Sequence, residues 1–457
     1  MATLSFPGSS ASSNYELDSS ISKASGIKAS SLLPPNIAEI QLESKEAVPL
    51  PPPAAAAGPP TFPEGGREAW TVAFGAWLAV LVSFGFLNAF GVFQHYYSVH
   101  QLAHVSSSAI SWIGAFQTFC IYFLGTLFGA LFDRWGAKPL LILGGLSFFL
   151  SCFLLSLSTA YWHFLLSQGL LGGLALSALF TPAYTAAQHY FLRRRGFALG
   201  VVTSGSSVGG VIWPIMANEL IAKVGFKTAI RIMGGVALAL CVVSAVLVKG
   251  RLPARKGKKF FAFELFKKSG YTMFCIGMFF MVWGLFFLVF FLPSYGALHG
   301  FNASMTFYSV SVLNAASLFG RIVPGFYADR WGRFNMMLGT SLASATLTFA
   351  CIAARSEASV LVIAVLYGFT SGNVFSLQGA CVPPFIDDPT KIGVAVGQLL
   401  SVSAFAGLTG PPIAGALIAH YGFWAAQVFA GVMILVGSLL IFGARQTLVG
   451  EGKKWIV

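Results

Sequence analysis

Long apolar runs separated by short polar stretches dominate the chain from Trp70 onward. Twelve of these runs are close to the roughly 20 residues that a helix needs to cross the hydrocarbon layer of a bilayer. Their approximate limits are 70–94, 107–132, 139–159, 161–190, 197–220, 227–248, 271–293, 304–328, 335–354, 358–382, 392–419 and 422–444. The pattern predicts an all-α membrane protein with twelve transmembrane helices.

A charged ten-residue stretch occurs twice, as GALFDRWGAK from Gly129 to Lys138 and as GFYADRWGRF from Gly325 to Phe334. Each copy lies between two apolar runs, so each is predicted to be a tight connection at the membrane surface. The Asp residues of the two copies are 196 residues apart, which is close to half of the chain that follows the polar N-terminal segment. The repeat therefore predicts two equivalent halves of six helices each.

Five segments follow from these observations: a disordered cytoplasmic tail (1–66), a first six-helix half (67–248), a basic cytoplasmic linker (249–270), a second six-helix half (271–444) and a cytoplasmic tail (445–457). The first tail is Ser-rich and then Pro/Ala-rich, a composition that cannot bury a core. Of the 26 Lys and Arg residues outside the spans, 23 fall on the side of the two termini. This bias places that side in the cytoplasm. The plasma membrane is favoured over an internal membrane.

Composition excludes several classes of protein. Hydrophobic residues make up 56% of the chain and charged residues only 9%, whereas soluble chains carry roughly 25% charged residues. The net charge of +13 lies in short loops, where it sets orientation, so we expect the lipid bilayer and not nucleic acid as a partner. The cysteines and histidines show no metal-ligand spacing, and no carboxylate falls in the middle of a span. The sequence therefore predicts neither an enzyme nor a metal or other cofactor site.

The exceptional polar residue inside the spans is Arg321. It lies eight residues before Asp329, which places it roughly 12 Å inside the membrane surface and near the middle of a hydrocarbon layer roughly 30 Å thick. A cation at that depth must face protein or water, and its planar fork matches a carboxylate. We expect Arg321 to bind an anionic substrate, the alternative being a structural arginine held by helix carbonyls. The other residues predicted to line the substrate site are Asn314, Ser317, Asn88, Tyr184, Asn373 and Gln398.

The repeated stretch resembles the signature loop of the major facilitator superfamily, which has the pattern G-x-x-x-D-R-x-G-x-[RK]. The resemblance implies two six-helix halves that expose a central site alternately to each side, and loops that lock one access state. The gating residues that it implies are Gly129, Asp133, Arg134, Gly136, Lys138, Gly325, Asp329, Arg330, Gly332 and Arg333. The alternative for these loops is an ion pair that only fixes topology.

Five further stretches resemble the monocarboxylate transporter family, especially its fungal members. They are Pro63 to Trp70, Asn88 to Gln94, Thr181 to Tyr184, Ser204 to Gly210 and Phe319 to Arg321. The proton-coupled animal members have an Asp where this chain has Ser317 and a Lys near Val92 and Asn88. Both differences remove titratable groups, so the resemblance does not extend to proton coupling.

Together these features predict a secondary transporter of a small organic anion, such as a monocarboxylate or a carboxylated metabolite. Two alternatives stay open within the same class: export of a secondary metabolite, and uptake of a neutral vitamin-like compound. A non-transporting nutrient sensor on the same scaffold is the alternative from another class. The sequence identifies neither the substrate nor an accessory protein.

Overall fold

The computed structural model describes residues 63–251, 262–388 and 391–452, which fold into helices joined by short connections. The first half contains α1 (Gly66–Leu87), α2 (Phe90–Val99), α3 (Ser107–Phe123), α4 (Gly125–Trp135), α5 (Ala137–Ser156), α6 (Tyr161–Phe164), a π-helix (Leu165–Gly172), α7 (Gly173–Gln188) and α8 (Arg195–Leu247). The second half contains α9 (Ser269–Leu298), α10 (Ala303–Trp331), α11 (Arg333–Ala350), α12 (Glu357–Leu377), α13 (Ile392–Tyr421) and α14 (Phe423–Gly450). Short 3₁₀ turns occupy Phe263–Lys267, Cys351–Ala353 and Pro383–Phe385.

Several predicted spans are built from more than one helical piece. The first span combines α1 and α2, the second combines α3 and α4, and the fourth combines α6, the π-helix and α7. Conversely, α8 carries two predicted spans, because Gly225 has φ 75° and ψ 162° and breaks the helix. Glycine accepts this left-handed φ without strain. The predicted limits 197–220 and 227–248 lie on either side of Gly225.

Ten helical segments of the described chain are long and apolar enough to cross a membrane. One of them is α8 with its two spans, and α10, which carries Arg321, is not among the ten. All twelve predicted spans nevertheless coincide with helices. The prediction of an all-α membrane fold is therefore confirmed. The linker residues 252–261 and the tails 1–62 and 453–457 lie outside the described residues.

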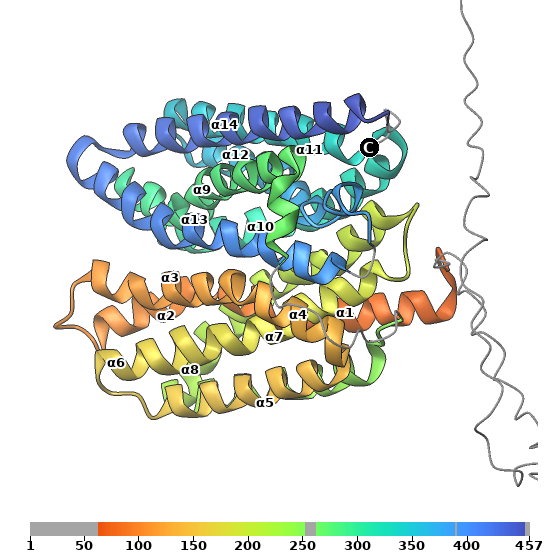
Figure 1. Ribbon diagram of the computed structural model, residues 1–457. Coiled ribbons are helices and arrows are strands. Elements are labelled where there is room, and N and C mark those ends of the chain that lie inside the picture. The colour runs from red at the N-terminus through yellow and green to blue at the C-terminus, as the bar shows by residue number, and fades with distance from the viewer. Residues whose placement is uncertain (1–62, 252–261, 389–390, 453–457) are drawn as a thin grey trace, which may run out of the picture. The chain divides into compact units, whose positions relative to one another are not determined.

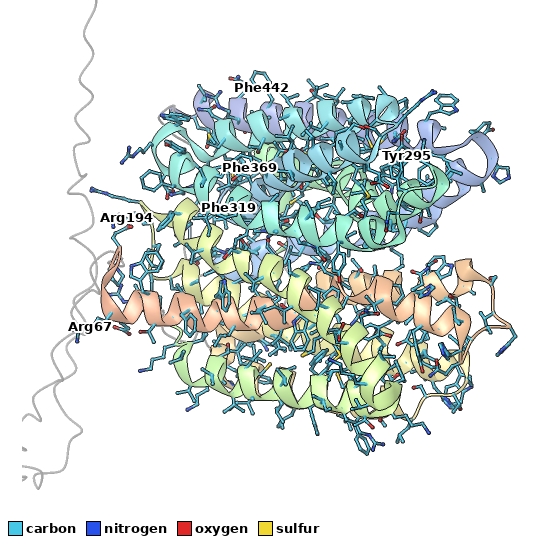
Figure 2. All side chains as sticks on the ribbon, turned by 180° about the vertical axis from the view of Figure 1, so that it is seen from behind. Arg67, Arg194, Tyr295, Phe319, Phe369 and Phe442 are labelled. Carbon is cyan, nitrogen blue, oxygen red and sulfur yellow. The ribbon has the colours of Figure 1, made fainter. Side chains whose placement is uncertain are left out.

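The helices form two bundles, one of α1 to α8 and one of α9 to α14 (Figure 1). The main contacts between the bundles are made by α8 with α10 and by α13 with α3 and α4. Figure 2 shows Arg67 and Arg194 at one end of the bundles and Tyr295 at the other. We call the end with Arg67 and Arg194 the signature-loop end, because the second signature loop contacts the residues beside Arg194.

Glycines let the two halves approach each other closely near the signature-loop end. A Cβ atom at Gly200 of α8 would lie 2.2 Å from the backbone oxygen of Arg321 on α10. In the corresponding place of the other half, a Cβ atom at Gly397 of α13 would lie 2.5 Å from the backbone oxygen of Gly125 on α4. Each glycine has a second one four residues earlier, Gly196 and Gly393. Small residues at this spacing let helix backbones touch. The halves are therefore packed against each other at this end.

Candidate substrate site and gate

Arg321 lies where the two halves meet. It projects from α10, and its Nε–H donates a hydrogen bond to Oγ of Ser317, one turn earlier, at 3.2 Å. Ser317 Oγ also accepts a hydrogen bond from Ser207 of α8 at 3.1 Å, so it links the halves. The guanidinium carbon lies 5.9 Å from the centre of the Phe375 ring on α12. Arg321 and Ser317 thus lie in contact, with Ser207 and Phe375 as further neighbours.

The guanidinium of Arg321 keeps most of its hydrogen-bonding capacity unused. Within the described part of the chain it forms no ion pair, and Nε–H is its only donor with a protein acceptor. The side chain is also partly accessible rather than sealed in the packing. A guanidinium carries five N–H donors in a planar fork. The free edge of the fork can therefore accept a carboxylate or another compact acidic group.

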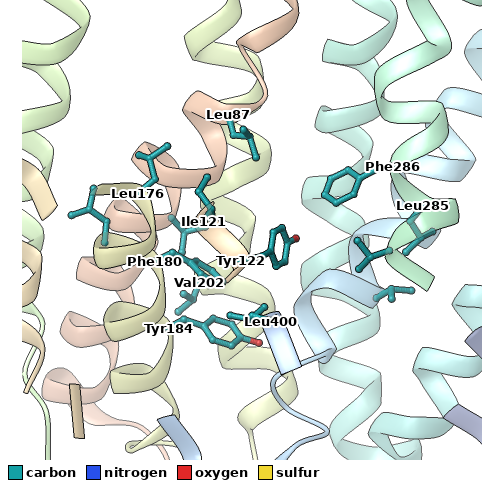
Figure 3. Close-up of a cluster of buried hydrophobic side chains, with 14 of the residues drawn as sticks. Leu87, Ile121, Tyr122, Leu176, Phe180, Tyr184, Val202, Leu285, Phe286 and Leu400 are labelled. Atoms are coloured by element: carbon teal, nitrogen blue, oxygen red, sulfur yellow. The ribbon is translucent and has the colours of Figure 1, made fainter. Parts of the chain in front are cut away.

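Aromatic rings in both halves form clusters that reach Arg321 through Tyr122 and Phe375. In the first half, Phe84 packs on Tyr122 at 5.4 Å and on Phe180 at 4.7 Å between ring centres. In the second half, Phe286 packs on Phe375 at 5.4 Å. Figure 3 shows Tyr122 and Phe286 facing each other from the two halves, with Tyr184 nearby. Tyr122 and Tyr184 both lie close enough to Arg321 to interact with its charge. Of these rings, only Tyr184 was predicted from the sequence.

Asn88 and Asn314, both predicted to line the site, meet at Gly210 of α8. A Cβ atom at Gly210 would lie 2.8 Å from Nδ2 of Asn88 and 2.8 Å from Cγ of Asn314. Asn88 Nδ2–H also donates to the backbone oxygen of Ser206 at 3.5 Å, and Asn314 Nδ2–H donates to that of Val310 at 3.1 Å. The pair lies about two helical turns from Arg321 along α10. Gly210 thus brings one polar side chain from each half close together, away from the guanidinium.

Tyr184, Asn373 and Gln398 have different surroundings. The hydroxyl of Tyr184 donates to the backbone oxygen of Ser376 in the other half at 3.1 Å, so Tyr184 lies at the boundary between the halves. Asn373 Nδ2–H donates to Oγ1 of Thr340 at 2.9 Å, which turns this side chain toward α11 within its own half. Gln398 is buried on α13, and Phe405, seven residues later on the same face of that helix, is exposed. Tyr184 also lies close enough to Arg321 to interact with its charge.

Asp329 of the second signature loop caps a helix of the opposite half. Its Oδ1 accepts a hydrogen bond from the backbone N–H of Gly196 at 2.8 Å, and its Oδ2 accepts one from Phe197 at 2.9 Å. Both N–H groups belong to the first turn of α8, where helix amides lack intrahelical partners. A carboxylate there is stabilised by these bonds and by the helix dipole.

Asp133 of the first signature loop has the matching position. A Cβ atom at Gly393, in the first turn of α13, would lie 2.7 Å from Asp133 Oδ1. Gly129 is also close, since a Cβ atom there would lie 2.4 Å from the backbone oxygen of Gly393. Each signature loop therefore rests on the first turn of a helix from the other half. Gly136 and Gly332, with φ of 76° and 96°, provide the left-handed turns that end α4 and α10.

The basic residues of the two loops differ in their contacts. Arg333 lies 3.3 Å from Asp329, and its NH2 group donates to the backbone oxygen of Leu192 at 2.7 Å. Arg330 is exposed, with its guanidinium 4.8 Å from the Phe326 ring centre. Lys138 is exposed and Arg134 is partly exposed. Arg333 is thus a predicted gating cation that connects the halves directly.

Glu64 also binds the segment between α7 and α8 that Arg333 contacts, although Glu64 falls within the predicted tail 1–66. Its Oε1 accepts hydrogen bonds from the backbone N–H groups of Leu192 at 2.9 Å and Arg193 at 2.7 Å, and Oε2 accepts one from Arg194 at 3.1 Å. Three successive amides that converge on one carboxylate form an anion-binding nest. The only signal in the sequence was the short Pro63 to Trp70 stretch.

A histidine lies in this loop region, just after α7. His189 is buried, and its ring centre lies 5.3 Å from that of Phe132. Burial, and secondly the positive charge of Arg195, lower the pKa of the His189 imidazole to about 4. His189 is therefore neutral at physiological pH. No group of three or more His, Cys, Asp or Glu residues that could hold a metal ion occurs within the described ranges.

Comparison with known families agrees with the resemblance that the two signature loops indicated. Residues 72–386 match the family described as Major Facilitator Superfamily. The chain belongs to the major facilitator superfamily. A solved structure, that of the human organic anion transporter MFSD10 (TETRAN), has the same fold, with a TM-score of 0.67 and 16% sequence identity over 82% of this chain and 100% of that one. This member of the superfamily is thus an integral, multi-pass membrane protein of a transporter family.

Fungal transporters are much closer in sequence. The aspyridones efflux protein apdF of Emericella nidulans is 39% identical over 420 residues, which cover 91% of this chain and 86% of the relative. The MFS transporter asaE of Aspergillus flavus is 39% identical over 87% of this chain and 91% of the relative. The agnestins efflux protein AgnL12 of Paecilomyces divaricatus is 38% identical over 82% of this chain and 86% of the relative.

Proposed function

We propose that this protein exports an acidic secondary metabolite by alternating access, with Arg321 binding the acidic group. The observation that carries the proposal is the free edge of the Arg321 guanidinium, which lies between the halves with no carboxylate partner in the described residues. A charge near the middle of a membrane is costly unless it is paired. An incoming anionic substrate supplies the partner, so binding and charge neutralisation are a single event.

The direction of transport is inferred from the relatives. Two of them, each at least 38% identical over more than 80% of this chain, are named as efflux proteins for the aspyridones and the agnestins. These names favour export of a secondary metabolite over the uptake of a small monocarboxylate. They also favour transport over a sensor on the same scaffold. The aromatic rings around Arg321 suit a substrate with a larger apolar body than a short-chain monocarboxylate has.

The contacts at the signature-loop end act as the gate in the proposed transport cycle. In this conformation Asp329, Asp133 and the paired glycines hold the signature-loop end closed. With that end in the cytoplasm, as the distribution of Lys and Arg predicts, the site in this state is sealed from the cytoplasm. Loading of an export substrate then requires these contacts to part, and its release requires them to form again.

A metabolite comparison tests the proposed function. Cells that produce the protein, cells that lack it and cells with Arg321→Ala are grown in parallel, and the compounds in cells and medium are compared by mass spectrometry. Gly235→Ala is the control variant, because a Cβ atom there would meet no atom within 4 Å. We expect an acidic compound that is retained in cells without the protein or with Arg321→Ala. Retention of neutral compounds only, or depletion from the medium by the wild type, would contradict the proposal.

A further inference from the structure

Two aromatic rings, one from each half, meet beside Arg321. The ring centres of Tyr122 on α3 and Phe286 on α9 are 6.4 Å apart, and the ring planes are at 82°. Each ring is supported within its own half, Tyr122 by Phe84 at 5.4 Å and Phe286 by the stacked ring of Phe290 at 5.3 Å. Figure 3 shows the pair spanning the boundary between the halves. The contact therefore changes whenever the halves move relative to each other.

The ring pair and the charge belong to one site. Tyr122 lies close enough to Arg321 to feel its charge, and Phe375, which packs on Phe286, lies beneath the guanidinium. An acidic group on the free edge of Arg321 would therefore place the body of the same molecule beside Tyr122 and Phe286. Both rings are almost fully buried in this conformation, with 1% and 9% exposure, so a ligand body that inserts between them must separate them.

The geometry of the pair favours a flat, conjugated body. Ring pairs are attractive at centre separations of roughly 4.5 to 7 Å and gain free energy beyond the area that they bury. A planar ring inserted between Tyr122 and Phe286 replaces one ring contact by two. A saturated body of the same size is thicker and has no π-face, so it would separate the halves further without regaining those contacts.

We propose that Tyr122 and Phe286 form an aromatic clamp that selects planar, conjugated acids over saturated acids of the same size and charge. The inference rests on the proposed function, because it assumes that Arg321 holds the acidic group. The clamp also connects recognition to movement. A planar ligand that touches one ring from each half bridges the halves, whereas the empty protein relies on direct contact between the rings.

A matched set of probes tests the clamp. Binding of naphthalene-2-carboxylate, decahydronaphthalene-2-carboxylate and naphthalene-2-carboxamide to the purified protein is measured by isothermal titration calorimetry. The first two differ in planarity at equal charge, and the first and third differ in charge at equal planarity. The variants are Tyr122→Leu, Phe286→Leu, Arg321→Gln and the ring-conserving Tyr122→Phe. Phe442→Leu is the control, because Phe442 is exposed on α14, away from the site (Figure 2).

We expect the wild type, Tyr122→Phe and Phe442→Leu to bind the planar acid about tenfold more tightly than the saturated acid. Tyr122→Leu and Phe286→Leu should abolish this preference while both acids still bind. Equal affinity of the wild type for the two acids would overturn the clamp and leave acid binding by Arg321 intact. A preference that survives both leucine variants would also overturn it. If Arg321→Gln or the carboxamide left affinity unchanged, the anion site of the proposed function would be wrong, whereas the clamp is judged by the ring preference alone.

Discussion

Oδ1 of Asp329 accepts a hydrogen bond from the backbone N–H of Gly196 at 2.8 Å, so the signature loop of one half caps a helix of the other. The neighbouring N–H of Phe197 donates to Oδ2 at 2.9 Å. A carboxylate is well suited to this position, because both oxygens accept and the helix N-terminus carries a partial positive charge. The contact exists only while the halves are closed at the signature-loop end.

Asp329→Asn should destabilise the closed state of that end. The amide keeps one acceptor, but its NH₂ group then faces a backbone N–H, and the charge is lost. Loss of a good cap costs about 1 kcal/mol, which reduces the population of the closed state relative to the open one about fivefold. Distances between spin labels at Arg194 and Trp331, both exposed at that end, measure the shift. Asp133→Asn should act similarly at α13.

Substrate affinity is the control for the gating role. Asp329 is eight residues from Arg321 along α10, and Asp133 is on α4, so neither contacts the proposed anion site. Equilibrium binding to either variant should stay close to that of the wild type. Loss of binding in a variant that is folded and reaches the membrane would show that the loop contributes to the substrate site itself.

Gly200→Ala should prevent full closure of the signature-loop end. The new Cβ atom would lie 2.2 Å from the backbone oxygen of Arg321, and a backbone atom cannot rotate away as a side chain can. We expect the halves to stay apart at that end and transport to fall to a small fraction of the wild-type rate. Gly235→Ala, in the second of the two spans of α8, is the matched control, since its Cβ atom would meet nothing within 4 Å. Equal transport by both variants in proteoliposomes would argue against the tight contact between α8 and α10.

Transport should depend only weakly on a proton gradient. Arg321 keeps its proton at any working pH, and its hydrogen-bond partner Ser317 does not titrate in that range. Accumulation in proteoliposomes with and without a pH gradient measures the coupling. Ser317→Asp places a titratable group one turn from Arg321 and should introduce a dependence on the gradient. Strong gradient-driven accumulation by the wild type would refute the uncoupled mechanism.

His189 should make the folded protein sensitive to acid. Its pKa is about 4 in the folded protein against an ordinary value of 6.5. Between pH 6.5 and 4 the unfolded chain gains a proton that the folded protein does not, so the folded state loses up to about 3 kcal/mol of stability. Above pH 6.5 the imidazole is neutral in both states and has no such effect. Thermal unfolding in detergent should show a smaller loss between pH 7.5 and 4.5 for His189→Gln than for the wild type. Equal losses would show that His189 does not contribute.

The depth of a residue in the membrane follows from the sequence, but the direction in which it points does not. Counting back from Asp329 placed Arg321 near the middle of its span, and the repeat of the signature loop indicated two halves. Gln398 and Asn373 also lie in the spans that were predicted for them. Their roles depend on the rotation of each helix about its axis, which an apolar span without a clear polar face does not reveal.

Sequence patterns also could not predict which distant segments contact each other. Tyr122 and Phe286 belong to different halves, and many other aromatic residues in the same spans would have been equally plausible partners. Glu64 follows a Pro/Ala-rich segment whose composition indicates disorder, and its role depends on three amides more than 120 residues later. Helix periodicity contains no information about such pairings.

The two signature loops differ at the position that follows their second glycine. The second loop has Arg333 at this position, and its guanidinium donates a hydrogen bond to the backbone oxygen of Leu192. The first loop has Ala137, whose methyl side chain cannot form such a bond. Arg333 begins α11 and binds the segment just before α8, so the second loop has a charged attachment to the other half at a position where the first loop has an uncharged side chain. We expect α13 to separate from α4 first when the signature-loop end opens, so that the halves swing about the α8–α10 contact and the entrance to the site widens asymmetrically.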